Sequence, residues 1–248
     1  MAADSYARFM GRFSEPLAVQ FLRAADVQPG QRALDVGCGP GALTAKLVER
    51  LGADAVTAID PSPPFVAAIR ERLPGVDAHL GTAEHLPYSD GQFDCALAQL
   101  VVHFMADPVV GLREMGRVTR SGGVVAACVW DHAGGRSPLT PFWRAVAELD
   151  PGARNEEHLA GAREGHLAEL ADAAGLGDIE ATTLTVAVRY ASFADWWEPF
   201  MLGVGPAGTY VEGLDREQRH RLRNRAAHLL PEPPFELAAS AWCLVARA

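Results

Sequence analysis

The sequence predicts an α/β fold in which a mostly parallel, doubly wound sheet carries helices on both faces. Short apolar runs bounded by turn residues alternate with longer amphipathic stretches over residues 33–130, the pattern of repeated strand–helix units. The run at 95–100 is apolar almost throughout, as expected for a parallel strand buried on both faces. At 248 residues, the chain is expected to form a single domain over 1–248.

The first strand–helix unit surrounds a glycine-rich turn. Residues 33–36 form a short apolar run, Gly37, Gly39 and Gly41 follow, and residues 42–51 have helical spacing with Gly52 as the C-terminal cap. Glycine leaves room for a ligand to approach the backbone and permits positive φ. The helix N-terminus behind the turn offers unpaired N–H groups, which suits a nucleoside ligand with an anionic group.

Asp35 bears on the choice between two ligand classes. The residues Gly37-x-Gly39-x-x-Ala42 match the dinucleotide fingerprint, and an NAD(P)-dependent oxidoreductase is one interpretation. A carboxylate two residues before the first glycine would repel a pyrophosphate but attract an ammonium and a sulfonium. S-adenosylmethionine (SAM) carries both groups, so Asp35 favours SAM.

A second carboxylate, Asp60, ends the predicted strand 55–60. It follows Gly37 by roughly the 20 positions typical of a ribose-binding acid. The alternative is a capping residue for the helix that begins near Ser62. We favour the ribose, because one carboxylate can accept hydrogen bonds from both ribose hydroxyls.

The run Asp35-Val36-Gly37-Cys38-Gly39-Pro40-Gly41 resembles the first motif of class I SAM-dependent methyltransferases, in the ubiquinone/menaquinone-biosynthesis-like (methyltransferase type 11) branch. The resemblance covers roughly residues 6–130. It implies a Rossmann-like, seven-stranded sheet with an antiparallel last strand, SAM as cofactor and S-adenosylhomocysteine as product. It does not indicate the acceptor or the atom that is methylated. Binding of SAM for sensing or for non-methyl chemistry is the alternative that shares the same motifs.

The resemblance also implies further cofactor contacts, and one of them departs from the usual pattern. Thr82-Ala83-Glu84 resembles the adenine-edge motif, with Thr82 in place of the commonest acid, so the Ala83 N–H and the Thr82 hydroxyl are expected to serve there. Glu84 is expected either to contact the ligand or to cap its own turn. The other expected contacts are Tyr6, Arg12, Cys38, Pro61, Ser62, Gln99 and Leu100.

Two residues are candidates for the chemistry. His103 follows the fourth strand and is the best general base, although a histidine beside apolar residues is often structural. Tyr6 is the best polar group to orient the acceptor. Whether a base is needed depends on the acceptor.

The flanking segments are expected to be helical. Residues 1–26 predict lid helices, the second starting after a cap at Ser14, and residues 192–232 predict an aromatic-rich helical cap. An acceptor pocket between residues 6–13, 130–143 and 196–210 suggests an apolar or aromatic small molecule; alternatively, the aromatic residues only close a marginal cap. The remaining elements are expected at 77–81 (strand), 108–120 (helix), 124–130 (strand), 142–149 and 165–174 (helices), and 179–190 and 235–246 (strands).

The amino-acid composition limits the classes of molecule that the protein is expected to bind. A net charge of −9 argues against nucleic acid, and no apolar run reaches membrane-spanning length. The four cysteines lie far apart without a C-x-x-C pair, so disulfides and zinc are not expected, and no metal-ligand spacing is present. With no signal-peptide pattern, we expect a cytoplasmic protein that acts on a small molecule, as a monomer or homodimer.

Overall fold

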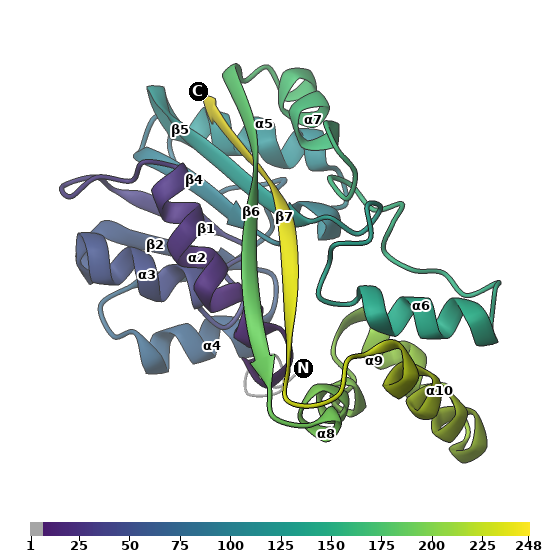
Figure 1. The fold of residues 1–248 in the computed structure, drawn as a ribbon. Helices are drawn as coiled ribbons and strands as arrows, with labels where there is room; N and C mark the ends of the chain where they lie inside the picture. Colours follow the sequence, from purple (N-terminus) through teal and green to yellow (C-terminus); the bar gives the residue numbers. More distant parts are fainter. Residues whose placement is uncertain (1–6) are drawn as a thin grey trace.

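The computed structural model describes residues 7–248, which contain one seven-stranded sheet in the order β3-β2-β1-β4-β5-β7-β6 (Figure 1). Strands β1 to β5 pair in parallel, whereas β7 runs antiparallel to both of its neighbours. The strands are β1 (Ala33–Val36), β2 (Val56–Asp60), β3 (Asp77–Leu80), β4 (Phe93–Gln99), β5 (Thr119–Trp130), β6 (Gly177–Tyr190) and β7 (Phe235–Arg247). The mostly parallel, Rossmann-like sheet with an antiparallel last strand is therefore confirmed.

The strand order reverses between β1 and β4. Ala33 and Asp35 of β1 pair with Val56 and Ala58 of β2 on one side, and β4 pairs on the other. In open α/β sheets, ligands bind outside the carboxyl ends of the strands at such a reversal. The glycine turn follows β1 and residues 100–104 follow β4, so both segments lie at the carboxyl ends of the two strands between which the order reverses.

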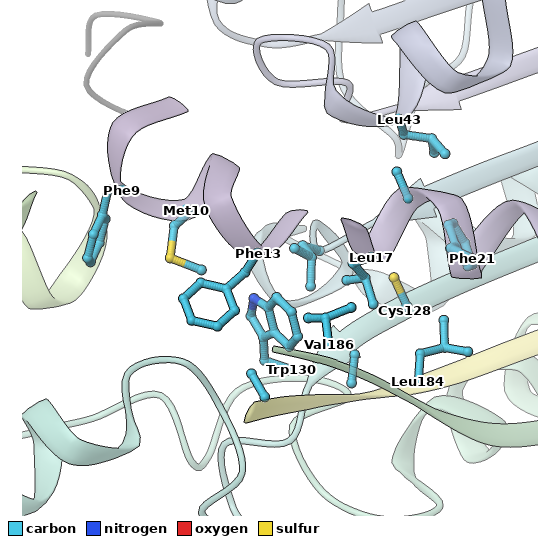
Figure 2. Packing of buried hydrophobic residues seen from close by; sticks show 14 of the residues in the cluster. Phe9, Met10, Phe13, Leu17, Phe21, Leu43, Cys128, Trp130, Leu184 and Val186 are labelled. Carbon is cyan, nitrogen blue, oxygen red and sulfur yellow. The ribbon is translucent and has the colours of Figure 1, made fainter. Parts of the chain in front are cut away.

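Helices cover both faces of the sheet, because successive side chains of the buried strands enter different cores. In β4, Cys95 and Leu97 belong to one apolar cluster, whereas Ala96 and Ala98 belong to the other. The first cluster is covered by α2 (Arg12–Ala24), α3 (Ala42–Leu51) and α4 (Pro63–Arg72), and the second by α5 (Pro108–Val118) and α7 (His166–Ala174). Figure 2 shows Leu17 and Phe21 of α2 above Cys128, Leu184 and Val186 in the first of these cores.

The second of the two predicted N-terminal helices begins earlier than predicted. A π-helical turn, η1 (Ala7–Gly11), leads directly into α2, and Ser14 is a buried residue inside that helix. The predicted cap at Ser14 is therefore wrong. Ser14 lies instead on the packed face, where its main-chain carbonyl accepts a hydrogen bond from Gln99. Pro16 lies inside α2, where it has no main-chain N–H to donate to the preceding turn.

The predicted helical segment after β6 is present and packs with α6 (Thr140–Leu149). Phe142 of α6 stacks on Phe200 with ring centroids 4.6 Å apart, and α10 contacts α6 directly. The segment comprises α8 (Phe193–Trp197), η4 (Glu198–Leu202), α9 (Gly205–Glu212) and α10 (Arg216–Leu229). Figure 1 shows these helices grouped beyond the carboxyl ends of the parallel strands. We call the group the cap.

Two short 3₁₀ turns complete the main elements, η2 (Ala53–Ala55) and η3 (Val102–Phe104). Across residues 7–248, none of the helices combines the length and the apolar character needed to cross a lipid bilayer.

Candidate functional site

The glycine turn after β1 is shaped by close contact with neighbouring segments. Gly37 donates its N–H to the Ile59 carbonyl at 2.8 Å and has a φ of 68°. A Cβ at Gly37 would lie 2.2 Å from Val101 Cγ2, so no side chain fits there. Gly39 also has a positive φ, 53°, but open space surrounds its Cα on the side where a Cβ would point. The turn is thus packed against the protein at Gly37 and open at Gly39.

Asp60 faces this turn from the end of β2. Its Oδ2 accepts the Gly39 N–H at 2.9 Å and its Oδ1 accepts the Ser62 N–H at 2.8 Å. Ser62, rather than Asp60, is the N-cap of α4. Burial raises the pKa of Asp60, although both amide hydrogen bonds oppose that shift. Each carboxylate oxygen still has acceptor capacity for a ligand hydroxyl.

Asp35 is buried at the base of the same turn. Its Oδ2 accepts a hydrogen bond of 2.6 Å from the Thr44 hydroxyl in α3, and only 1% of the residue is exposed. Burial raises the pKa of Asp35 to about 7, against the opposing effect of the Thr44 hydrogen bond. A cation nearby would favour the ionised form.

These segments enclose a cavity of about 100 Å³. Two polar atoms from its lining residues, Ser14 Oγ and Gln99 Oε1, are buried without a hydrogen-bond partner in the described chain. Buried polar atoms normally have partners, so these two are candidate contacts for a ligand group. The lining residues are Ser14, Asp35, Gly37, Cys38, Gly39, Pro40, Ala42, Leu43, Asp60, Phe65, Gln99, Leu100, Val101 and Phe104.

Leu100 is held in an unusual backbone conformation at this cavity. Its φ is 60°, which is rare for a bulky residue, and its N–H donates to the Cys128 carbonyl at 2.8 Å. Such strain persists only where the surrounding structure imposes it, and it is found preferentially at functional sites. The conformation turns the chain away from β4, so that Val101 and Phe104 also line the cavity.

Half of the predicted cofactor residues line this cavity. Asp35, Gly37, Cys38, Gly39, Asp60, Gln99 and Leu100 are brought together. Pro61 and Ser62 follow Asp60 at the same sheet edge. The turn Thr82–Glu84 is tied to that edge because Gly81 donates its N–H to the Asp60 carbonyl at 3.2 Å. Glu84 Oε1 accepts the Ala106 N–H at 2.7 Å, so its side chain is already used to hold a local loop.

The N-terminal candidates are placed differently. Arg12 does not line the cavity; its guanidinium pairs with Asp195 of the cap at 2.8 Å and donates to the Arg189 carbonyl. The same group lies over the Tyr190 ring, 4.4 Å from its centroid. Tyr6 lies outside the described residues. Arg12 in this structure therefore connects α2 to the cap.

His103 lies in η3 next to a second histidine, His132, which follows β5. Their ring centroids are 6.1 Å apart. Burial, with a further effect from His132, lowers the pKa of His103 to about 3. Burial lowers the pKa of His132 to about 4, and Asp131 opposes that shift. His103 Nδ1 has no partner among the described atoms and is neutral at pH 7. No local pattern in the sequence marks His132 as a neighbour of His103.

A second, much smaller cavity of about 10 Å³ lies where the acceptor pocket was expected. Phe9 and Phe13 come from the N-terminal segment, Leu139 from the loop after β5, and Trp196 and Phe200 from the cap. The Phe9 and Phe200 rings meet edge to face, 4.9 Å apart. Its volume is about that of a single solvent probe, so these aromatic side chains are packed against one another.

Comparison with known proteins identifies the part of the chain that contains the glycine turn. Residues 34–127 match the family model described as "Methyltransferase domain". These residues form a methyltransferase domain. The predicted resemblance is therefore confirmed over the segment that supplies the glycine turn, Asp60, Gln99 and Leu100.

Relatives of this methyltransferase domain are found among characterised and uncharacterised proteins. An uncharacterised methyltransferase of Mycobacterium tuberculosis is 40% identical over 116 residues, covering 47% of this chain and 45% of the relative. A demethylmenaquinone methyltransferase of Paenarthrobacter aurescens is 32% identical over 121 residues, covering 49% and 45%. The chain thus spans about half the length of these relatives, or less.

Solved structures extend the similarity of fold over the whole chain. A SAM-dependent methyltransferase of Thermotoga maritima superposes with a TM-score of 0.58, covering 99% of this chain and 96% of the other at 19% identity. At this level of identity, only the fold is shared. The β6–β7 pair and the cap therefore belong to the same architecture as the methyltransferase domain.

Several lining residues could not be identified from the sequence. Ser14, Phe65, Val101 and Phe104 line the main cavity but have no motif. The position of Val101 and Phe104 could have been predicted in one way. They directly follow a buried parallel strand, and ligands bind at the carboxyl ends of such strands. No sequence pattern could have predicted Ser14 at the cavity, because its approach to Gln99 depends on how α2 docks against the sheet.

Proposed function

We propose that this protein is a SAM-dependent methyltransferase that acts on a small apolar or aromatic molecule. The observation that carries the proposal is the chemistry of the main cavity. Among the described residues, its lining offers two carboxyl groups, the unpartnered oxygens of Ser14 and Gln99, and no lysine, arginine or histidine. A pyrophosphate would find no counter-charge there, whereas a ligand with an ammonium and a sulfonium would.

The residues fit SAM in two parts. Asp35, Ser14 and Gln99 would bind the ammonium of the amino-acid end, because they supply acceptor oxygens inside the cavity. Asp60 would accept the ribose hydroxyls. The remainder of the cofactor would lie along the open edge at Pro61, Ser62 and Thr82–Glu84, since 100 Å³ encloses only part of a ligand of this size. Arg12 could reach a cofactor carboxylate only if its ion pair with Asp195 were broken.

SAM supplies a methyl group already activated by its sulfonium, so the protein mainly has to position the acceptor and exclude water. The aromatic side chains around Phe13 and Phe200 would enclose the acceptor. His103 is neutral at pH 7 and remains the candidate base, although it lines neither cavity, so its buried Nδ1 could take a proton from an acceptor only if the site opened toward it. Its low pKa makes it a weak base, which suits an acceptor that is nucleophilic without full deprotonation.

The aromatic composition of the second cavity supports an apolar or aromatic acceptor. Phe9, Phe13, Trp196 and Phe200 line it, and opening it would expose several rings to the ligand. A relative named for demethylmenaquinone is consistent with an acceptor of this kind. The alternative is that these rings only stabilise the cap.

The test is transfer of an isotopically labelled methyl group from SAM to a panel of phenols, quinols and aromatic amines, with product mass as the readout. Labelled product together with S-adenosylhomocysteine supports the proposal. Calorimetric titration with S-adenosylhomocysteine and with NAD⁺ runs in parallel. Binding of S-adenosylhomocysteine without any labelled product would favour a sensing or non-methyl role. Binding of NAD⁺ alone would overturn the proposal.

A further inference from the structure

Helix α10 concentrates positive charge in an acidic chain. It contains five arginines and one glutamate, whereas the whole chain has a net charge of −9. Arg216, Arg219 and Arg223 are spaced i, i+3 and i+7 and therefore lie on one face of the helix. Only Leu222 and Ala226 of this helix are buried. The cationic face is therefore presented outward.

These arginines have few acidic partners. Of the five, only Arg225 forms an ion pair in the described chain, with Glu148 of α6. Arg216 forms no described ion pair or hydrogen bond, Arg219 donates to the main-chain carbonyls of Val211 and Leu214, and Arg223 lies over the Phe193 ring. The charge on this face is therefore left without a carboxylate partner among residues 7–248.

The same face forms one wall of an open groove of about 710 Å³, and η4 forms the other wall. Trp197 and Met201 supply apolar surface opposite the arginines, and Met201 is 41% exposed. Glu198 and Glu217 also line the groove and interrupt its positive charge. The groove thus combines separate cationic positions with an apolar wall.

We propose that this groove is a docking surface for an acidic protein segment. Carboxylates on the partner would pair with Arg216 and Arg223, and an apolar side chain would contact Met201. The two glutamates separate the cationic positions, which suits spaced carboxylates on a protein segment better than the continuous array of phosphates of a nucleic acid. An anionic membrane is disfavoured because the apolar residues of α10 are buried and cannot insert into lipid.

The groove is close to the aromatic cavity because η4 borders both. Phe200 and Pro199 line the cavity, whereas Glu198 and Met201 of the same turn line the groove. If the cavity receives the acceptor, which rests on the proposed function, a partner in the groove would lie beside it. The docking surface itself does not depend on that function.

The experiment measures binding of a fluorescent polyglutamate peptide of about 20 residues to the full chain by anisotropy. Arg216→Glu is compared with Arg221→Glu, which makes the same charge change on the same helix but outside the groove. Both residues are exposed, so both variants are expected to keep the wild-type unfolding temperature. We expect Arg216→Glu to weaken binding at least tenfold and Arg221→Glu by less than twofold, with amide NMR shifts centred on α10 and η4.

Three results would overturn the proposal. The first is no polyglutamate binding at low salt, and the second is equal weakening by both variants, which would indicate non-specific charge attraction. The third is tighter, Arg216-dependent binding of duplex DNA or of phosphatidylserine vesicles, which would assign the groove to another class of partner. None of these outcomes bears on SAM binding, which is measured separately with S-adenosylhomocysteine.

Discussion

The side-chain amide of Gln99, at the end of β4, donates a hydrogen bond of 3.0 Å to the main-chain carbonyl of Ser14 in α2. This bond ties the N-terminal helix to the ligand-binding edge of the sheet. It also leaves Gln99 Oε1 and Ser14 Oγ buried without partners in the described chain. An unsatisfied buried polar group costs about 1–3 kcal/mol, so a ligand that donates hydrogen bonds here gains affinity.

Replacement of Ser14 by alanine should therefore affect affinity and stability differently. We expect the dissociation constant for S-adenosylhomocysteine to rise about three- to tenfold, because a hydrogen bond is lost. The free energy of unfolding without ligand should stay the same or increase slightly, because an unpartnered hydroxyl is removed. Calorimetry and urea unfolding measure the two effects. Replacement of the exposed Ser121 of β5 by alanine is the control, and an affinity for Ser14→Ala within twofold of wild type would argue against a ligand contact.

Two alanine substitutions in the glycine turn should have opposite main effects. Gly37→Ala would place a Cβ 2.2 Å from Val101 Cγ2, so we expect a loss of about 2–3 kcal/mol of stability, partly restored by Val101→Ala. Gly39→Ala meets no atom within 4 Å and should cost only about 1–2 kcal/mol for its positive φ. At the cavity, however, its methyl group should weaken S-adenosylhomocysteine binding at least tenfold. Equal losses of stability for the two variants would contradict this picture.

The affinity for SAM should depend on pH through Asp35. Burial raises the pKa of this carboxyl to about 7, and a cationic ligand favours its ionised form. Below pH 7 the ligand must displace a proton, so affinity should rise about three- to tenfold between pH 6 and 7.5. Calorimetry in buffers of different ionisation enthalpy would detect the released proton. Asp35→Asn should bind SAM more weakly, and its affinity should not change in this way with pH. A wild-type affinity that decreases as the pH rises from 6 to 7.5 would contradict the assignment.

His103 should reduce stability in mild acid. Its pKa is about 3 in the folded state, against about 6.5 in an unfolded chain. Between these values the unfolded state binds the proton and the folded state does not, so stability falls as pH decreases from 6.5. His103→Gln should lose less stability than wild type between pH 7 and 5, as measured by urea unfolding. The exposed His85→Gln is the control, and an unchanged slope in His103→Gln would mean that the imidazole is not protected from protons.

Local patterns predicted much of the fold. The strand at Ala33–Val36 and the helix at Ala42–Leu51 occur with the predicted bounds. Both were predicted from apolar runs that end at glycines, and these patterns depend only on neighbouring residues. Asp60 was found for a similar reason, since its spacing from Gly37 follows from one strand–helix–strand unit. The predicted site residues that line the cavity lie in, or directly after, segments that have such local signals.

Contacts between distant segments could not be predicted in the same way. Arg12 was expected at the cofactor, but the structure pairs it with Asp195, far away in sequence. Ser14 was interpreted as a helix cap because serine before Glu-Pro is a local start signal, yet the docking of α2 on the sheet buries it. His132 escaped notice because its nearness to His103 depends on the adjacency of β4 and β5.

The most direct test of the account is calorimetric titration of the wild type, Asp60→Asn and Asp60→Ala with S-adenosylhomocysteine. Asp60 is the one residue that links the glycine turn, through Gly39, to the expected ribose position. We predict micromolar binding by the wild type, a loss of at least tenfold in Asp60→Ala (about 1.4 kcal/mol), and an intermediate loss in Asp60→Asn, which keeps one acceptor oxygen. No binding by a folded wild type would contradict the assignment of this cavity to SAM, and unchanged affinity in Asp60→Ala would contradict the role of Asp60.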